Sequence, residues 1–309
     1  MLHKTLHIVN GDSLTPRLTK IGVADDQLVW REMLCEGKTV YDLKTDAFKE
    51  ARMEYLKQFI DTELTYDESF LIPLLTTNFS KYSTIVLWFE YDLFCHINML
   101  AALSHIKQLK ISSKIYLVCS GWVENETQLK GLGELSDEQL LTHYKNKILL
   151  TEADIALADT LWKLYCSDNH IDFKNYVTTR SSFPYLTNCI NAHLKRFPNI
   201  ASGLNVLETH ILKIIRQEEI KNTRQLTGYI LQYQGYYGFG DLQITHIIDK
   251  LSRFYETKNE RLDLNREGFL AVDEMQNFYE EVLDETIFGN CEKYKFCYHP
   301  SEQIVTKHE

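Results

Sequence analysis

The sequence predicts an α/β fold, in which a small Rossmann-like, mostly parallel sheet is followed by a helical connector and a winged-helix-like carboxy-terminal domain. One observation is the apolar run Ile85–Phe89, whose β-branched and aromatic residues are typical of a strand buried on both faces. Another is the alternation of strand-like and helix-like segments over the first third of the chain. A third is the succession of amphipathic segments and short extended segments near the carboxy terminus. We place the domains at 1–122, 123–202 and 203–309.

Four strands and two helices are expected in the amino-terminal domain. Each strand is a short, mainly apolar run that ends at a polar turn. The expected strands are Leu6–Val9, Gln27–Arg31, Ile85–Phe89 and Lys114–Cys119. The expected helices are Asp46–Glu63 and the segment from Phe94 to Leu103, in which apolar residues repeat at near-helical spacing.

Helices are expected to continue through the middle of the chain. Ser136 and Gln139 form a capping box that opens a helix, and Thr151 caps a second helix that runs to Tyr165. Phe183-Pro184 precedes a third helix, Tyr185–Arg196, whose last turn carries positive charge that complements the helix dipole.

Three helices and a two-stranded wing are expected after residue 203. The helices are Val206–Arg216, Thr223–Tyr233 and Asp241–Phe254, and the wing strands are Arg261–Leu264 and Gly268–Val272. The tail, residues 294–305, is expected to form a last strand or a hairpin. Winged helices bind DNA or other proteins.

The charge of this region disfavours DNA. Residues 203–309 contain 12 Lys and Arg against 18 Asp and Glu, a balance of −6. Because phosphate contacts normally dominate affinity for DNA, a protein partner or a homodimer is the favoured use of the domain.

The composition of the whole chain limits its function further. A net charge of −10 and a pI near 5.6 give no electrostatic reason to expect nucleic acid or an anionic membrane as partner. No apolar run approaches the roughly 20 residues that span a bilayer. The seven cysteines are odd in number and never spaced as CxxC, which favours reduced thiols and a cytoplasmic location over a disulfide framework or a zinc site.

Polar side chains follow the expected strands, at the edge where open α/β sheets bind ligands. Asn10-Gly11-Asp12-Ser13 is a tight turn after the first strand, and its backbone amides could hold an anion. Glu32 follows the second strand, and Glu90 and Asp92 follow the apolar run. Neither GxGxxG nor GxxxxGK[ST] occurs. We therefore expect a small anionic or nucleotide-like ligand at this edge, coupled to a protein-interaction module.

Two enzymatic interpretations of the same edge are open. If Asp12, Glu32, Glu90 and Asp92 converge, they would bind magnesium for a hydrolase or transferase acting on phosphate esters. The competing interpretation is that these acids cap helices or pair with arginines. No metal ligand is assigned, and magnesium is the one cofactor considered.

The second enzymatic interpretation concerns the sequence GDSL at residues 11–14, which opens one class of serine hydrolases. That chemistry needs a histidine and an aspartate to activate Ser13. The usual late Asp-x-x-His pair is absent, and the nearest match, Asp168-Asn169-His170, has the wrong spacing. A turn or anion-binding role is therefore favoured for Ser13, and no catalytic residue is assigned.

Seven motifs give the chain a family resemblance. In order they are HIVNGDSL, VWREMLCEG, IVLWFEYDLFCHINML, GLGELSDEQL, LLTEADIALADTLWKLY, RFPNIASGLNVLETHIL and GFGDLQ. Together they resemble the bacterial domain of unknown function 1835 family over nearly the whole chain. The resemblance implies an amino-terminal α/β domain and a helical carboxy-terminal part, and no activity. The residues that fit the family pattern are Asn10, Gly11, Asp12, Ser13, Glu32, Gly37, Arg52, Trp88, Asp92, Gly133 and Asp241.

The candidate site follows from the strand ends and the resemblance. The expected ligand-binding residues are Asn10, Gly11, Asp12, Ser13, Glu32, Arg52, Trp88, Glu90 and Asp92. The acids and Ser13 are expected around a single cleft. Trp88 is expected to be buried beside that cleft, because a large aromatic side chain at the end of a central strand usually packs in the core.

Overall fold

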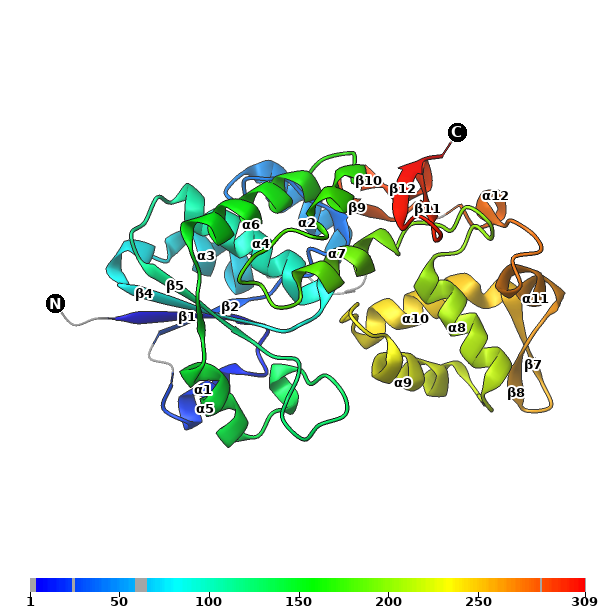
Figure 1. Cartoon of the computed structure of the whole chain (residues 1–309), viewed down its shortest axis with the longest axis horizontal. Helices are drawn as coiled ribbons and strands as arrows, with labels where there is room; N and C mark the ends of the chain where they lie inside the picture. The colour runs from blue at the N-terminus through cyan, green and yellow to red at the C-terminus, as the bar shows by residue number, and fades with distance from the viewer. Residues whose placement is uncertain (1–3, 24–25, 59–65, 284, 309) are drawn as a thin grey trace.

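The computed structural model describes residues 4–23, 26–58, 66–283 and 285–308, and it confirms a mixed α/β fold (Figure 1). Five strands form one sheet in the order β2-β1-β4-β5-β6. Four of them are parallel, whereas β6 runs antiparallel at the edge and is not among the expected strands. Their bounds are β1 (Thr5–Asn10), β2 (Asp26–Trp30), β4 (Thr84–Phe89), β5 (Lys114–Cys119) and β6 (Ile148–Leu149).

Helices cover both faces of this sheet, which is why its central strands are apolar throughout (Figure 1). Side chains on one face, among them Val86 and Trp88, pack under two helices, α1 (Thr15–Lys20) and α5 (Asp137–Lys145). The helices on the other side are α2 (Asp46–Leu56), α3 (Ile72–Thr76), α4 (Leu93–Gln108) and α6 (Glu152–Tyr165). Every residue of α4 from Cys95 to Ile106 is buried, so this helix lies at the centre of the molecule.

Residues 123–202, expected as a helical connector, contribute to these layers through α5, β6 and α6. The expected caps form, since Ser136 accepts a hydrogen bond from the Gln139 amide and Thr151 accepts one from the Asp154 amide. A last helix of this segment, α7 (Leu186–Leu194), ends two residues before Arg196. In the amino-terminal domain, α2 ends at Leu56, earlier than the expected Glu63, and residues 59–63 lie outside the described residues.

The three helices expected after residue 203 form, although the third ends as an α-helix at Lys250 and continues to the expected Phe254 only as a 3-10 turn, and part of the expected wing is wrong. The strand Arg261–Leu264 (β8) pairs with Tyr255–Lys258 (β7), and the segment expected as its partner forms the helix α11 (Arg266–Val272). Asn265 caps that helix by accepting a hydrogen bond from the Gly268 amide. We call α8 to α11, with the hairpin, the helical module; its first three helices are α8 (Val206–Gln217), α9 (Thr223–Tyr233) and α10 (Asp241–Lys250).

After the helical module the chain returns to the α/β part. A short helix, α12 (Tyr279–Val282), leads to β9 (Ile287–Gly289), which pairs in parallel with β3 (Gly37–Lys38) and antiparallel with β10 (Cys291–Glu292). Of the two forms expected for the tail, a last strand or a hairpin, the structure has the hairpin, formed by β11 (Phe296–His299) and β12 (Ile304–Lys307). All seven cysteines are free. Among the described residues, no helix combines the length and the apolar character needed to cross a membrane.

Candidate functional site

The strand order places the topological switch point of the sheet between β1 and β4. The chain passes from β1 to β2 on one side and later enters β4 on the other side. Ligands of open α/β sheets bind beside such a point, at the carboxyl ends of the strands. Asn10 ends β1, and Glu90 to Asp92 follow β4, so these predicted residues lie at the switch point.

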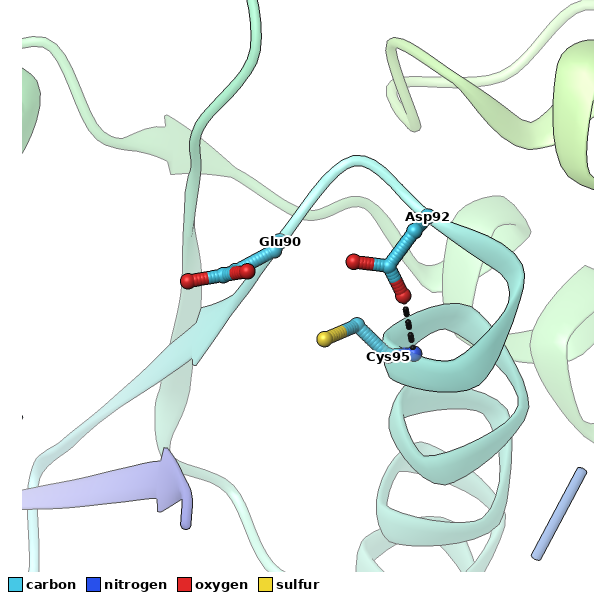
Figure 2. A group of neighbouring side chains, drawn as sticks. All are labelled: Glu90, Asp92 and Cys95. Carbon is cyan, nitrogen blue, oxygen red and sulfur yellow. Dashed lines mark hydrogen bonds between the residues drawn. The ribbon is translucent and has the colours of Figure 1, made fainter. Parts of the chain in front are cut away.

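Two acids and a thiol cluster at this point. The ligand atoms of Glu90, Asp92 and Cys95 all lie within 4.8 Å of one another. Asp92 is the N-cap of α4, and its Oδ1 accepts a hydrogen bond of 2.7 Å from the Cys95 amide (Figure 2). Glu90 accepts a hydrogen bond of 3.3 Å from the amide of Gly133.

The electrostatics of this cluster favour protonated groups. Burial, and then the nearby Glu90 charge, raise the pKa of Asp92 to about 7. Burial also raises the pKa of Glu90, although the amides of Gly133 and Leu132 oppose that rise. Burial likewise raises the pKa of the Cys95 thiol. Because its pKa lies near 7, the Asp92 carboxyl is mainly protonated below neutral pH.

A network of amide side chains joins this cluster to the ends of the neighbouring strands. Asn10 donates from Nδ2 to Cys95 Sγ, at 3.1 Å, and accepts from Asn98 Nδ2, at 2.9 Å. Asn98 is fully buried on α4 and also donates to the backbone oxygen of Glu32, at 2.6 Å. Sequence reasoning missed Asn98, although an amide among the apolar residues of a central helix is a signal of a buried polar network.

Glu32 belongs to a buried ion pair instead of an open acidic site. Both Glu32 and Arg52 have fully buried side chains, and Arg52 Nη2 lies 2.9 Å from Glu32 Oε2. The hydroxyl of Tyr66 also donates to this carboxylate. Arg52 further donates to the backbone oxygens of Met33, Glu36 and Lys38. The pair therefore fixes the loop that follows β2.

The turn after β1 is exposed and carries a separate ion pair. Asp12 lies 2.6 Å from Arg31 Nη2, and this hydrogen-bonded guanidinium lowers the pKa of the Asp12 carboxyl. Ser13 is exposed, whereas His170 is fully buried and contacts the Tyr165 backbone and His193. Both ring nitrogens of His170 are engaged in these contacts, so this histidine does not serve as the base that a Ser13 nucleophile would need.

Trp88 is a core residue. Its side chain is fully buried, donates from Nε1 to His7 Nδ1 at 3.0 Å and stacks on Tyr144 with ring planes 8° apart. These partners lie in the layer formed with α1 and α5, across the sheet from α4. The expected burial is confirmed, and the side chain is not presented to a ligand.

The predicted acids therefore have three different sets of partners. Asp12 pairs with Arg31 at the surface, Glu32 pairs with Arg52 in the core, and Glu90 and Asp92 cluster at the start of α4. Among the described residues, no group of three candidate metal ligands includes Asp12 or Glu32. Because Asp12 and Glu32 are paired with arginines, the four acids do not form one set of metal ligands.

The helical module closes the switch point. Its turn Gly235–Gly240, which we call the clamp turn, contributes the backbone oxygens of Tyr236 and Tyr237. These accept hydrogen bonds from the Leu93 and Phe94 amides, at 2.8 and 3.2 Å. A Cβ atom at Gly238 would lie 2.2 Å from Asp92 Cγ. The first amides of α4 are thus occupied by the module's backbone and are not open to an anion.

A cavity of about 670 Å³ lies between the α/β part and the helical module. Its walls come from the loop after β2, from Arg196, from the clamp turn and from α10. Sequence reasoning did not identify this cavity, because it assigned Arg196 only to the end of a helix. Some residues that meet here are far apart in the chain, since Glu36 and Gln243 are 207 positions apart, and no local pattern reports their contact.

Comparisons with known proteins add no family to this description. No protein-family model matches the chain, and no curated protein matches it.

Proposed function

We propose that this chain is a ligand-responsive binding protein: a small anionic ligand binds where the carboxyl edge of the sheet meets the helical module, and binding alters how the module packs. The clamp turn is the observation that carries this proposal. It joins Leu93 and Phe94, at the switch point of the sheet, directly to the backbone of the module. A movement of the sheet edge would therefore be transmitted to the module without a further element.

Such coupling requires that the contact between the clamp turn and α4 can adopt two arrangements. Asp92 lies at this contact, and a change in its carboxyl would favour one arrangement over the other. Asp92 is 6% exposed and lies against Gly238, while burial raises its pKa to about 7. A ligand that changes the protonation or position of this carboxyl changes the fit of the clamp turn. Differential affinity for the two arrangements is what allows a ligand to shift such an equilibrium.

A magnesium-dependent hydrolase or transferase is less well supported. Only Glu90 and Asp92 of the expected acids come together, and the third group beside them is the Cys95 thiol. Magnesium prefers oxygen ligands and octahedral geometry, which this set does not offer.

The helical module is better suited to a protein partner or a second copy of the chain than to DNA. Its order of three helices and a hairpin supports a winged-helix assignment. However, α10, which would be the recognition helix, contributes His246, Ile247 and Lys250 to the cavity wall. Gln243 on the same helix donates to Glu36, at 2.8 Å. We also propose, from the ordered motifs alone, that the chain belongs to the domain of unknown function 1835 family.

A thermal-shift screen of the full chain tests this proposal. The probes are inorganic phosphate, AMP and acetate, each with and without magnesium, followed by hydrogen exchange on any combination that raises Tm. The proposal expects stabilisation without magnesium, together with slower exchange both at the start of α4 and in the helical module. Stabilisation only with magnesium would favour phosphate-ester chemistry, and protection confined to the α/β part would contradict the coupling.

A further inference from the structure

The guanidinium of Arg196, at the cavity between the α/β part and the helical module, is buried and has a hydrogen-bond donor without a partner in the described ranges of the chain. Arg196 is 3% exposed; its Nη2 donates to the backbone oxygen of Cys35, and its Nη1 has no hydrogen-bond partner among the described residues. Arg196 also interacts electrostatically with the buried Tyr165 hydroxyl. Burial raises the pKa of this phenol, and the positive guanidinium opposes that rise. A guanidinium has five N–H donors, and a buried donor without a partner is costly.

The carboxylate of Glu36 does not form a close ion pair with Arg196. Glu36 Oε1 lies 3.9 Å from Arg196 Nη2, beyond hydrogen-bond distance. The other oxygen of Glu36 is already engaged, since Oε2 accepts from the Tyr55 hydroxyl at 3.0 Å and from Gln243 at 2.8 Å. Arg196 therefore keeps capacity for another negatively charged group.

A second polar group of the cavity wall, the hydroxyl of Tyr237, is also a buried donor without a partner among the described residues. Tyr237 is 7% exposed, and within the described part of the chain its hydroxyl has no hydrogen-bond partner. Tyr237 belongs to the clamp turn, where its backbone oxygen accepts the Phe94 amide. A ligand that contacts this side chain would act on the residue that holds the clamp turn against α4.

The rest of the wall indicates the size and charge of the ligand. A volume of about 670 Å³ is that of a small-molecule site. Four Glu side chains and four Lys or Arg side chains line the cavity, together with His246, and Lys293 and Glu208 form a buried ion pair at 2.9 Å. A ligand with one negative charge suits this balance better than a polyphosphate. The Phe288 ring is covered by the Arg196 guanidinium, whose Cζ lies 3.6 Å from the ring centroid, while Phe239 and the half-buried Ile247 add apolar side chains to the wall.

We propose that this cavity binds a small organic anion whose single carboxylate or phosphate group is held by Arg196 and Tyr237, with its apolar part against Phe239 and Ile247. The assignment rests on the proposed function and gives that function a site and a ligand class. Oxyanion recognition by a guanidinium is favoured because the planar fork matches carboxylate and phosphate oxygens. Binding through Tyr237 links the occupied cavity to the clamp turn.

Calorimetric titration of the full chain tests the assignment, with benzoate and inorganic phosphate as probes and chloride at equal ionic strength as reference. Wild type should bind at least one probe saturably. Tyr237→Phe, which removes only a hydroxyl, should weaken that binding about tenfold or more, and Arg196→Gln should abolish it. Arg31→Gln, which removes an exposed arginine at the sheet edge, is the matched control and should leave affinity unchanged.

The variants separate failure of this site from failure of the proposed function. Binding that Arg31→Gln weakens and Tyr237→Phe leaves intact would overturn the cavity assignment while keeping an anion site at the sheet edge. No saturable binding of either probe to wild type would overturn both. If Arg196→Gln does not fold, Tyr237→Phe decides, because phenylalanine preserves the packing of the ring. Unchanged affinity in Tyr237→Phe would contradict the assignment.

Discussion

Replacement of Gly238 by alanine tests whether the clamp turn closes the switch point. Gly238 has a φ of +70°, and a Cβ there would lie 2.2 Å from Asp92 Cγ. Asp92 cannot move away freely, because its carboxylate caps α4 through the Cys95 amide at 2.7 Å. The clamp turn must therefore retreat from α4 when the methyl group is added.

The expected cost has two parts that a second variant separates. Gly235 has a φ of +69° and no atoms within 4 Å of an added Cβ, so Gly235→Ala reports backbone strain alone, about 1 kcal/mol. Gly238→Ala carries the same strain and also loses the hydrogen bonds to Leu93 and Phe94, each about 1 kcal/mol. The total is about 3 kcal/mol, against about 1 kcal/mol for the control.

Urea denaturation of both variants measures these costs, and amide hydrogen exchange locates them. The Leu93 and Phe94 amides should lose protection in Gly238→Ala and keep it in Gly235→Ala. Equal free energies of unfolding for the two variants, with both amides still protected, would refute the clamp and with it the proposed coupling.

Three further predictions concern buried groups. Trp88→Ala should lower the free energy of unfolding by about 3–5 kcal/mol, measured by the denaturation midpoint, because the indole is fully buried; a near-neutral result would contradict its place in the core. Arg52→Met should cost about 3–5 kcal/mol because it leaves the buried Glu32 carboxylate unpaired, whereas Asp12→Asn, at an exposed pair, should cost less than about 1 kcal/mol. Burial raises the pKa of Asp92 to about 7 from an ordinary 3.8, so the folded chain binds a proton that the unfolded chain releases. The stability of wild type relative to Asp92→Asn should therefore fall as pH rises from about 4 to 7, by at most about 1.4 kcal/mol per unit, and a pH-independent difference would contradict the raised pKa.

Local patterns determined the elements of the α/β layer. The strand Lys114–Cys119 has the bounds that its apolar run predicts, and Ser136 and Thr151 cap helices as expected. Such predictions succeed because burial on both faces of a sheet, and the pairing of helix-end amides, depend on residues within a few positions of one another. The segment Arg266–Val272 shows the limit, since a short apolar run fits a strand or a helix equally, and the cap at Asn265 decided for a helix.

The candidate site was determined only by the tertiary structure. The sequence placed acids after strands, but it could not show that arginines had already neutralised Asp12 and Glu32. Neither could it pair Asp92 with Gly238, or bring Arg196 beside the loop that follows β2. Hydropathy periodicity predicts whether a side chain is buried, but it does not predict which distant residue that side chain contacts. The clamp turn and the cavity exist because the chain returns from the helical module to the sheet edge, and that return depends on packing between residues more than a hundred positions apart.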